Sequence, residues 1–164
     1  MPIPADPGTI AAVMALFRQV HDQLREELDG LDDDALNWIP TPEANSIATI
    51  VTHLVGSEAE TLRCVAGVEC ERDRDAEFGG HLRMMRDVLA LLHRADDLIA
   101  ELEPHIDHGR LTALIPLPTL PAEEVRPGLT WLIGNYGHAR EHVGHVQLTK
   151  QLRQRGGWTA SEHT

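Results

Sequence analysis

The sequence predicts an all-α protein, a four-helix bundle of antiparallel type that forms a single domain over residues 1–164. Two observations carry this prediction. Apolar residues recur at helical spacing over four long stretches, and no stretch shows the alternation of a convincing strand. The expected helices cover residues 7–29, 46–66, 81–103 and 129–155. A long proline-rich connection precedes the last helix and leaves the order of the helices open.

The first helix is expected to begin at Asp6-Pro7, an acidic N-cap followed by proline at the first helical position. Its apolar residues recur at helical spacing as far as Gly30, where the helix should stop. Residues 31–42 then predict a turn. Within that turn the sequence allows one short helical piece, around residues 33–36.

The second helix has a clear start and a clear end. Asn45 or Ser46 can accept a hydrogen bond from the first free backbone N–H groups, and Gly67 follows the last apolar residue. Residues 69–80 are charged and end in glycine, so we expect a loop there.

The third helix should run over residues 81–103 and stop before Pro104. Its apolar stripe begins at Leu82, and we expect Met84 and Met85 to lie in the core. Residues 111–127 contain four prolines and cannot form a regular helix, so we expect an extended connection across the surface. The last helix then ends at Gly156-Gly157.

Composition excludes several classes of partner. The chain has 14 Lys and Arg against 26 Asp and Glu, a formal charge of −12, which repels phosphate backbones and anionic lipid. We therefore expect no nucleic-acid or membrane partner, and a substrate that is neutral or cationic. The start of the chain lacks the pattern of a signal peptide, so the cytoplasm is the expected location. Cys64 and Cys70 are expected to be free thiols.

The last helix carries the clearest chemical signal, His138-Ala-Arg-Glu-His142-Val-Gly-His145. At about 100° per residue, His138 and His142 lie about 40° apart, and His145 falls close to His138. A helical wheel places this stripe, with Trp131 and Asn135, in the middle of the face expected to be buried. Two imidazoles at i and i+4 can bind one divalent cation. A hydrogen-bonded polar core or a pH-sensitive histidine cluster would also satisfy buried imidazoles.

The same segment matches the H-x-x-E-H pattern of inverted zinc peptidases. We reject that interpretation, because those enzymes take a further ligand far downstream on a large α/β fold. Glu141 is then a hydrogen-bond partner of a metal ligand, a general base, or a solvated side chain.

A third ligand must come from another helix. His53 lies midway along the second helix, at the edge of its apolar stripe, although a lone histidine there is more often a satisfied core-edge residue. The remaining histidines are weaker candidates because they have charged neighbours or lie at a helix end or in a loop; they are His21, His81, His93, His105 and His108.

Two segments resemble the DinB/YfiT-like superfamily of metal-binding four-helix bundles. They are Trp38-Ile-Pro with Asn45-Ser-Ile-Ala-Thr-Ile-Val-Thr-His53-Leu-Val-Gly-Ser-Glu58, and the segment from His138 to His145. The resemblance implies that His53, His138 and His142 hold a divalent ion such as nickel or zinc, and that the protein is a homodimer. His145 departs from the family pattern, in which glutamine is usual at this position.

The resemblance also implies a class of activity. Relatives include transferases and other enzymes that use a low-molecular-weight thiol, so we expect a metal-dependent transferase or hydrolase acting on a small molecule. Glu58, Glu141 and His145 are the candidate proton-transfer groups, and no residue is assigned to substrate binding. The alternative is a non-catalytic metal-binding or stress-related bundle that serves as a sensor, a store or an interaction protein.

Overall fold

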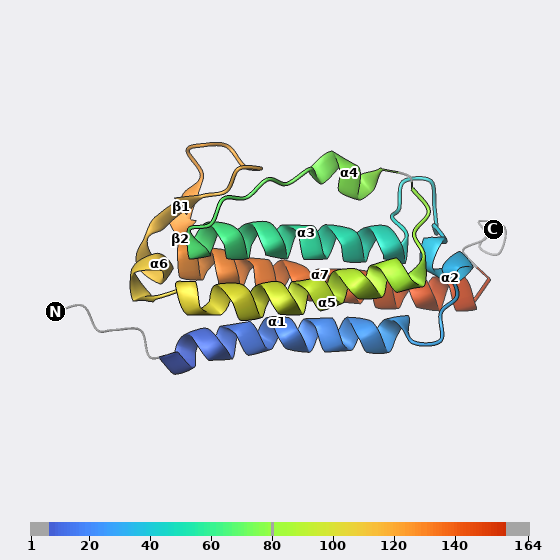
Figure 1. The fold of residues 1–164 in the computed structure, drawn as a ribbon. Coiled ribbons are helices and arrows are strands. Elements are labelled where there is room, and N and C mark those ends of the chain that lie inside the picture. The colour runs from blue at the N-terminus through green and yellow to red at the C-terminus, as the bar shows by residue number, and fades with distance from the viewer. Residues whose placement is uncertain (1–6, 80, 157–164) are drawn as a thin grey trace.

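The structure is a computed structural model that describes residues 7–79 and 81–156. Four long helices form a bundle (Figure 1), which confirms the predicted fold class; they are α1 (Pro7–Leu28), α3 (Ile47–Ala66), α5 (Met85–Leu102) and α7 (Gly128–Gln154). The shorter elements are α2 (Asp33–Asn37), α4 (Arg74–Phe78), the 3₁₀ helix η1 (Glu103–His105), α6 (His108–Thr112), β1 (Leu114–Pro116) and β2 (Val125–Pro127).

Each long helix packs against two others. α7 contacts α1 and α3, and α5 contacts the same two helices. The colours of Figure 1 show that α1 and α7 run in one direction and α3 and α5 in the other. The neighbours α1 and α7 are therefore parallel, as are α3 and α5, and the expectation of an antiparallel-type bundle is wrong for these pairs. Parallel neighbours need a connection that returns along the bundle. Between α3 and α5, residues 67–79 and 81–84 belong to this connection, which passes over α3 and carries α4.

The ends of α3 follow the sequence prediction. Ser46 is the N-cap, and its hydroxyl accepts a hydrogen bond from the backbone N–H of Thr49 at 3.2 Å. Gly67 is the C-cap with φ of 77°, a left-handed conformation that glycine adopts without strain. The expected N-cap of the first helix, Asp6, lies outside the described residues.

The start of the third long helix differs from the prediction. α5 begins at Met85 rather than at residue 81, because α2 binds the segment before it. Asn37 accepts a hydrogen bond from the Arg83 N–H and donates one to the Arg83 carbonyl, which keeps that segment extended. Asp33 accepts a hydrogen bond from the Met85 N–H at 2.7 Å and so caps α5 from another element. Two side chains expected in the core are exposed as a result, Leu82 and Met84 (84% and 43%).

Two connections contain more structure than the sequence indicated. The expected loop over residues 69–80 includes α4, which Asp73 caps through the Ala76 N–H. The expected extended connection over residues 111–127 begins within α6 and contains the antiparallel hairpin of β1 and β2. The Trp131 indole donates a hydrogen bond to the Ile115 carbonyl at 2.7 Å and fixes the hairpin on α7.

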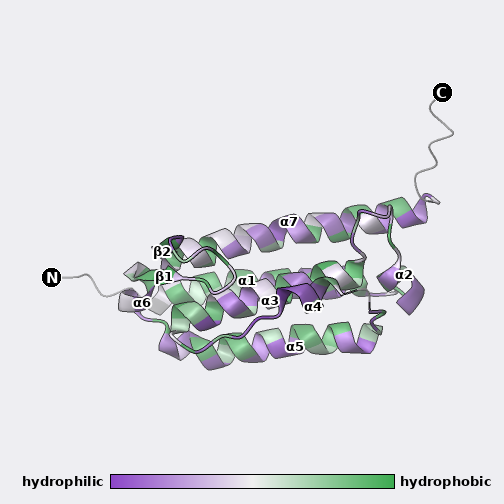
Figure 2. Cartoon of the chain, turned by 90° about the horizontal axis from the view of Figure 1, so that it is seen from above, coloured by the Kyte–Doolittle hydropathy of each residue, from purple (hydrophilic) through white to green (hydrophobic). Residues whose placement is uncertain are grey.

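The core consists of two apolar clusters, one toward each end of the bundle. On α1 the clusters meet between Phe17 and Val20, and on α3 they meet between Val55 and Leu62. A layer of buried polar side chains lies at this level; it contains His21, Glu58, Thr61 and Asn135. In Figure 2, hydrophilic residues lie along much of the length of α7. None of the described helices is both long and apolar enough to cross a membrane.

Candidate metal centre

Two adjacent helices bring the three predicted ligands together. His53 lies in the middle of α3, and His138 and His142 lie one turn apart on α7, the helix that packs most closely along α3. One nitrogen of each imidazole lies within 4.8 Å of a nitrogen of both others. The Nε2 atoms of His53 and His138 are 3.2 Å apart, and the ring centres of His138 and His142 are 4.3 Å apart. Three nitrogens at this separation could hold one small cation.

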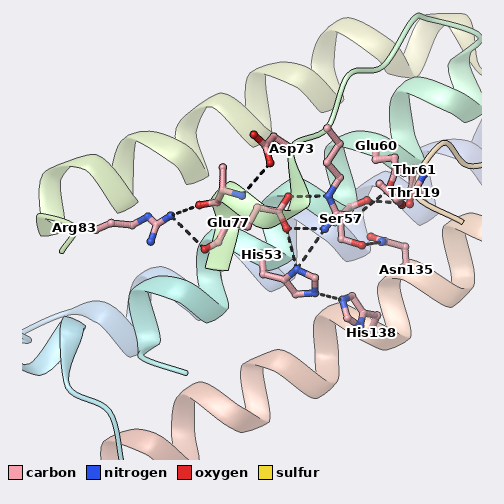
Figure 3. A network of polar contacts seen from close by, with 12 residues as sticks. His53, Ser57, Glu60, Thr61, Asp73, Glu77, Arg83, Thr119, Asn135 and His138 are labelled. Atoms are coloured by element: carbon pink, nitrogen blue, oxygen red, sulfur yellow. Dashed lines mark hydrogen bonds and ion pairs between the residues drawn. The ribbon is translucent and has the colours of Figure 1, made fainter. Parts of the chain in front are cut away.

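The connection between α3 and α5, which we call the crossover, orients His53. Nδ1 of His53 lies 2.9 Å from Oε2 of Glu77 on α4, and Figure 3 shows the carboxylate against the ring on the side away from His138. Arg72 also approaches Nδ1, at 3.3 Å, but a guanidinium can only donate. The shorter contact, with a carboxylate that can only accept, decides the tautomer: Nδ1–H donates to Glu77. Nε2 of His53 is thereby left as a lone pair that faces His138.

Glu77 is itself held in place. Arg72 donates to both of its carboxylate oxygens, at 2.7 and 2.8 Å, and also to Glu60 at 2.8 Å. The carboxylate lies so close to α3 that a Cβ atom added at Gly56 would be 2.1 Å from Oε1 of Glu77. A glycine at position 56 is therefore needed for the carboxylate to reach His53.

The three imidazoles are neutral near pH 7. Burial lowers the pKa of His53 even though Glu77 opposes the effect. Burial and the neighbouring His53 lower the pKa of His138. For His142, burial and repulsion from the other histidines lower the pKa to about 4. Neutral imidazole is the form that binds a metal, so the electrostatics keep these side chains ready to act as ligands.

One nitrogen of the cluster has no partner within the described part of the chain. Nε2 of His142 is buried without a hydrogen bond, a state that costs free energy unless a ligand satisfies it. Nδ1 of the same ring lies 3.3 Å from Nδ1 of His145, which can accept its proton. The unpartnered nitrogen and the three neutral rings fit a divalent cation of the kind that prefers nitrogen ligands.

The helical wheel predicted the buried face of α7 only in part. Ala139, Val143 and Val146 are buried, but His138 and His142 are half-buried, and His145 is exposed. Leu148, an apolar residue of the same helix, is 53% exposed. The histidine stripe therefore lies at the margin of the buried face rather than in its middle. A margin position gives the cluster both a packed side and an open side.

The open side faces a cavity of about 430 Å³. His53 and His138 line one part of it, and Trp131 and Asn135 of α7 line another. The crossover and the hairpin connection complete the wall, with Arg72 and Thr119 among the lining residues. This volume suits a small molecule.

The structure separates the three candidate proton-transfer groups. His145 contacts His142, and Glu141 is exposed and close enough to affect the pKa of His138. Glu58 is fully buried and accepts a hydrogen bond from Nε2 of His21 at 3.0 Å, so it belongs to a different polar cluster.

Several important residues escaped the sequence analysis. Arg72 and Glu77 fall in the segment expected to be a loop, where Asp73 three residues before Ala76 was the available signal for a short helix. His21 was ranked as a weak candidate but is completely buried, and its spacing from Phe17 and Leu24 on the apolar stripe would have indicated this.

The cysteines form no disulfide. Burial raises the pKa of Cys64 to about 11, and it also raises the pKa of Cys70. Both therefore remain protonated near neutral pH, and neither resembles a reactive thiol.

The comparisons with known proteins agree with this fold. YfiT from Bacillus subtilis, described as a probable metal-dependent hydrolase with an unusual four-helix bundle topology, superposes with a TM-score of 0.70. Its sequence is 15% identical, over 91% of this chain and 89% of that chain. A DinB-like protein from Bacillus cereus ATCC 10987 gives a TM-score of 0.63 at 15% identity, over 84% of this chain and 86% of that chain. No curated protein matches significantly.

A family model supplies the assignment that these structural similarities alone do not. The model of the DinB superfamily matches residues 16–146, a span that begins within α1 and includes His53, His138 and His142. Because the match covers most of the sequence, the protein belongs to the DinB superfamily.

Proposed function

We propose that this protein is a metal-dependent enzyme that acts on a small molecule, with His53, His138 and His142 as the ligands of a divalent ion. The observation that carries the proposal is the convergence of three neutral imidazoles beside a cavity that His53 and His138 line, with Nε2 of His142 buried and unpartnered among the described residues. A purely structural histidine cluster would be expected to satisfy that nitrogen.

The donor set narrows the chemistry. Three imidazoles favour zinc or nickel over magnesium or calcium, which prefer oxygen ligands. A divalent ion held this way lowers the pKa of a bound water or thiol toward neutrality and so supplies a nucleophile. A transferase or hydrolase that uses a small thiol is the activity we propose, and the description of YfiT as a probable metal-dependent hydrolase supports the same class.

The residues of the chain have separate roles in this proposal. Glu77 holds the Nδ1 proton of His53 and fixes the ring, while Arg72 fixes Glu77. Of the proton-transfer candidates, His145 and Glu141 are near the ligands. Glu58 is bonded to His21, so its role is in the core.

A non-catalytic metal-binding bundle is the second candidate function. The observation in its favour is that the carboxylate in contact with the cluster, Glu77, is already engaged by Arg72 and His53. A sensor, a store or an interaction protein would need the ligands but no free base.

Zinc titration of protein purified without a histidine tag tests metal binding. We expect one equivalent to bind, and we expect His142→Ala to weaken binding by at least about 100-fold, more than the loss of an outer partner causes. His93→Ala is the matched control, because His93 is an exposed histidine of α5. Absence of stoichiometric zinc or nickel binding by the wild-type protein would contradict both metal-dependent functions.

A turnover assay separates the two functions. The metal-loaded protein is incubated with small thiols and a panel of electrophiles, and thioether or hydrolysis products are measured by mass spectrometry. Turnover that disappears in folded His142→Ala supports the enzyme. Tight metal binding with no turnover across the panel favours the non-catalytic bundle.

A further inference from the structure

The wall of the cavity beside the histidines includes a positively charged side chain that forms no ion pair among the described residues. Arg74, at the start of α4, is exposed, and among the described residues its contact is with the Phe78 ring, 5.6 Å from the centroid. No carboxylate of the described chain pairs with it. Its charge acts on the site, because it is one of the groups that lower the pKa of His53.

The other charges on the cavity wall are already paired. Arg72 is bonded to Glu60 and Glu77, and its side chain is only 8% exposed. Glu60 also accepts hydrogen bonds from the N–H and the hydroxyl of Thr119, at 3.0 and 2.8 Å. Arg126 pairs with Glu124 and stacks on the Trp131 ring at 4.6 Å. Arg74 is therefore the cation of this wall that is available to a ligand.

A buried acceptor on the same wall also lacks a partner. Asn135 is 9% exposed, and its amide donates to the Ser57 hydroxyl at 2.9 Å. Its Oδ1 atom is buried with no hydrogen bond among the described residues. Such an atom is usually satisfied in a native protein, so a donor from a bound molecule or a water is expected there.

The remaining lining gives the cavity an apolar part. Leu117, Leu120 and Trp131 line it together with Arg74 and Asn135. An apolar surface with a few convergent polar groups is typical of a site for a small organic molecule.

We propose that this cavity binds an amphipathic carboxylate. The carboxylate pairs with Arg74, the apolar body lies against Trp131 and the two leucines, and a donor group satisfies Oδ1 of Asn135. A single guanidinium matches the two oxygens and the one negative charge of a carboxylate, whereas a phosphate monoester would bring nearly two negative charges to one unpaired cation. The proposal rests on the proposed function, since it names the substrate class of the same site.

This substrate class departs from the neutral or cationic one that the net charge of −12 favoured. Net charge governs the approach of a ligand from a distance, and salt screens that effect beyond about 8 Å at physiological ionic strength. The charge at the cavity wall governs binding. A carboxylate that meets the unpaired Arg74 gains a contact that a neutral molecule of the same shape lacks.

The test compares two probes on the metal-free protein, residues 1–164, by calorimetry. One probe is 4-phenylbutyrate, and the other is its neutral amide. We expect the carboxylate to bind about tenfold more tightly, as one charge-assisted hydrogen-bonded pair allows. Arg74→Gln should make the two affinities equal. The control Arg86→Gln, which removes an equally positive but 76% exposed side chain on α5, should leave the preference unchanged.

The indole N–H resonance of Trp131 reports where the probe binds. We expect it to shift with the carboxylate in the wild-type protein, because Trp131 lines the cavity. Equal affinities in the wild-type protein, a preference that survives Arg74→Gln, or binding with no Trp131 shift would each overturn the proposal. Zinc binding is measured separately, so a chain that prefers the carboxylate but binds no metal contradicts the proposed function alone.

Discussion

The bundle contains two histidine sites that differ in the partners of their ring nitrogens. His21 donates from both ring nitrogens to carboxylates, to Glu58 at 3.0 Å and to Asp96 at 2.6 Å. The cluster of His53, His138 and His142 turns nitrogens toward one another and leaves one of them without a partner. The first site is complete within the protein, whereas the second leaves Nε2 of His142 open to the divalent ion that we propose.

The pKa shifts follow the same division. Burial alone would lower the pKa of His21, but hydrogen bonds and charge from Glu58 and Asp96 outweigh it, and the pKa is raised. Without comparable carboxylate support, burial and mutual repulsion lower the pKa of His142 to about 4. One site therefore favours imidazolium and the other favours the neutral ligand form. The partners of a buried histidine, more than its burial, indicate whether it is structural or functional.

The largest expected effect is on the structural site. His21→Leu leaves Glu58 buried without its donor, and breaking a buried ion pair from one side costs about 3–5 kcal/mol of unfolding free energy. Zinc affinity should not change in the folded variant. Urea unfolding and zinc titration measure the two quantities.

The double variant His21→Leu/Glu58→Leu is the matched control, because it removes both partners. Replacing a buried pair by apolar residues is often neutral, so much of the lost stability should return. If His21→Leu were as stable as the wild-type protein, the His21–Glu58 contact would make no measurable contribution to the free energy of unfolding.

The second expected effect is on the functional site and acts through Glu77. Glu77→Gln removes the negative charge that orients His53, so zinc affinity should fall by about 10- to 100-fold. Gly56→Ala should act in the same direction, because the new Cβ would occupy the position of the carboxylate. Circular dichroism checks that both variants fold. Wild-type zinc affinity in both would rule out an orienting role for Glu77.

The third effect is a pH dependence that separates the two sites by its sign. Because the pKa of His21 is raised from 6.5 on folding, its stabilisation is complete below pH 6.5 and is lost as the pH rises through the raised value. Burial raises the pKa of Glu58, which acts in the same direction. The pKa values of the cluster histidines are lowered, so their effect is confined to pH values below 6.5.

Unfolding of the metal-free protein in urea between pH 6.5 and about pH 8 therefore reports mainly on the site of His21, whose stabilisation is lost as the pH rises above 6.5. We expect the stability of the wild-type protein to fall over this range and the stability of His21→Leu/Glu58→Leu to stay nearly constant. An equal fall in both proteins would assign the pH dependence to other groups.

The contrast between the two sites also explains what the sequence could predict. Apolar spacing located the four long helices, and local capping by Ser46 and Gly67 set both ends of α3, since these features depend on neighbouring residues. The start of α5 depends on Asp33, which is 52 residues away, so no local pattern could reveal it.

The candidate site likewise combines features that local sequence reveals with features that depend on distant contacts. The i and i+4 spacing of His138 and His142 is local and visible, and the family resemblance added His53. Glu77 and Arg72 reach His53 only because the crossover returns over α3, a consequence of the parallel pairing of α3 and α5. The partnership of His21 with Glu58 and Asp96 likewise joins three helices.

The smallest expected effect concerns His145, which stands where the family usually has glutamine. Its Nδ1 atom is placed to accept the proton on Nδ1 of His142, and a glutamine carbonyl could accept the same proton. His145→Gln should therefore change zinc affinity by less than about threefold, while His145→Ala, which removes the acceptor, should weaken it by about tenfold. Zinc titration at one pH gives both values. If glutamine weakens binding as much as alanine does, the imidazole itself contributes to the metal, and His145 is a ligand rather than the partner of one.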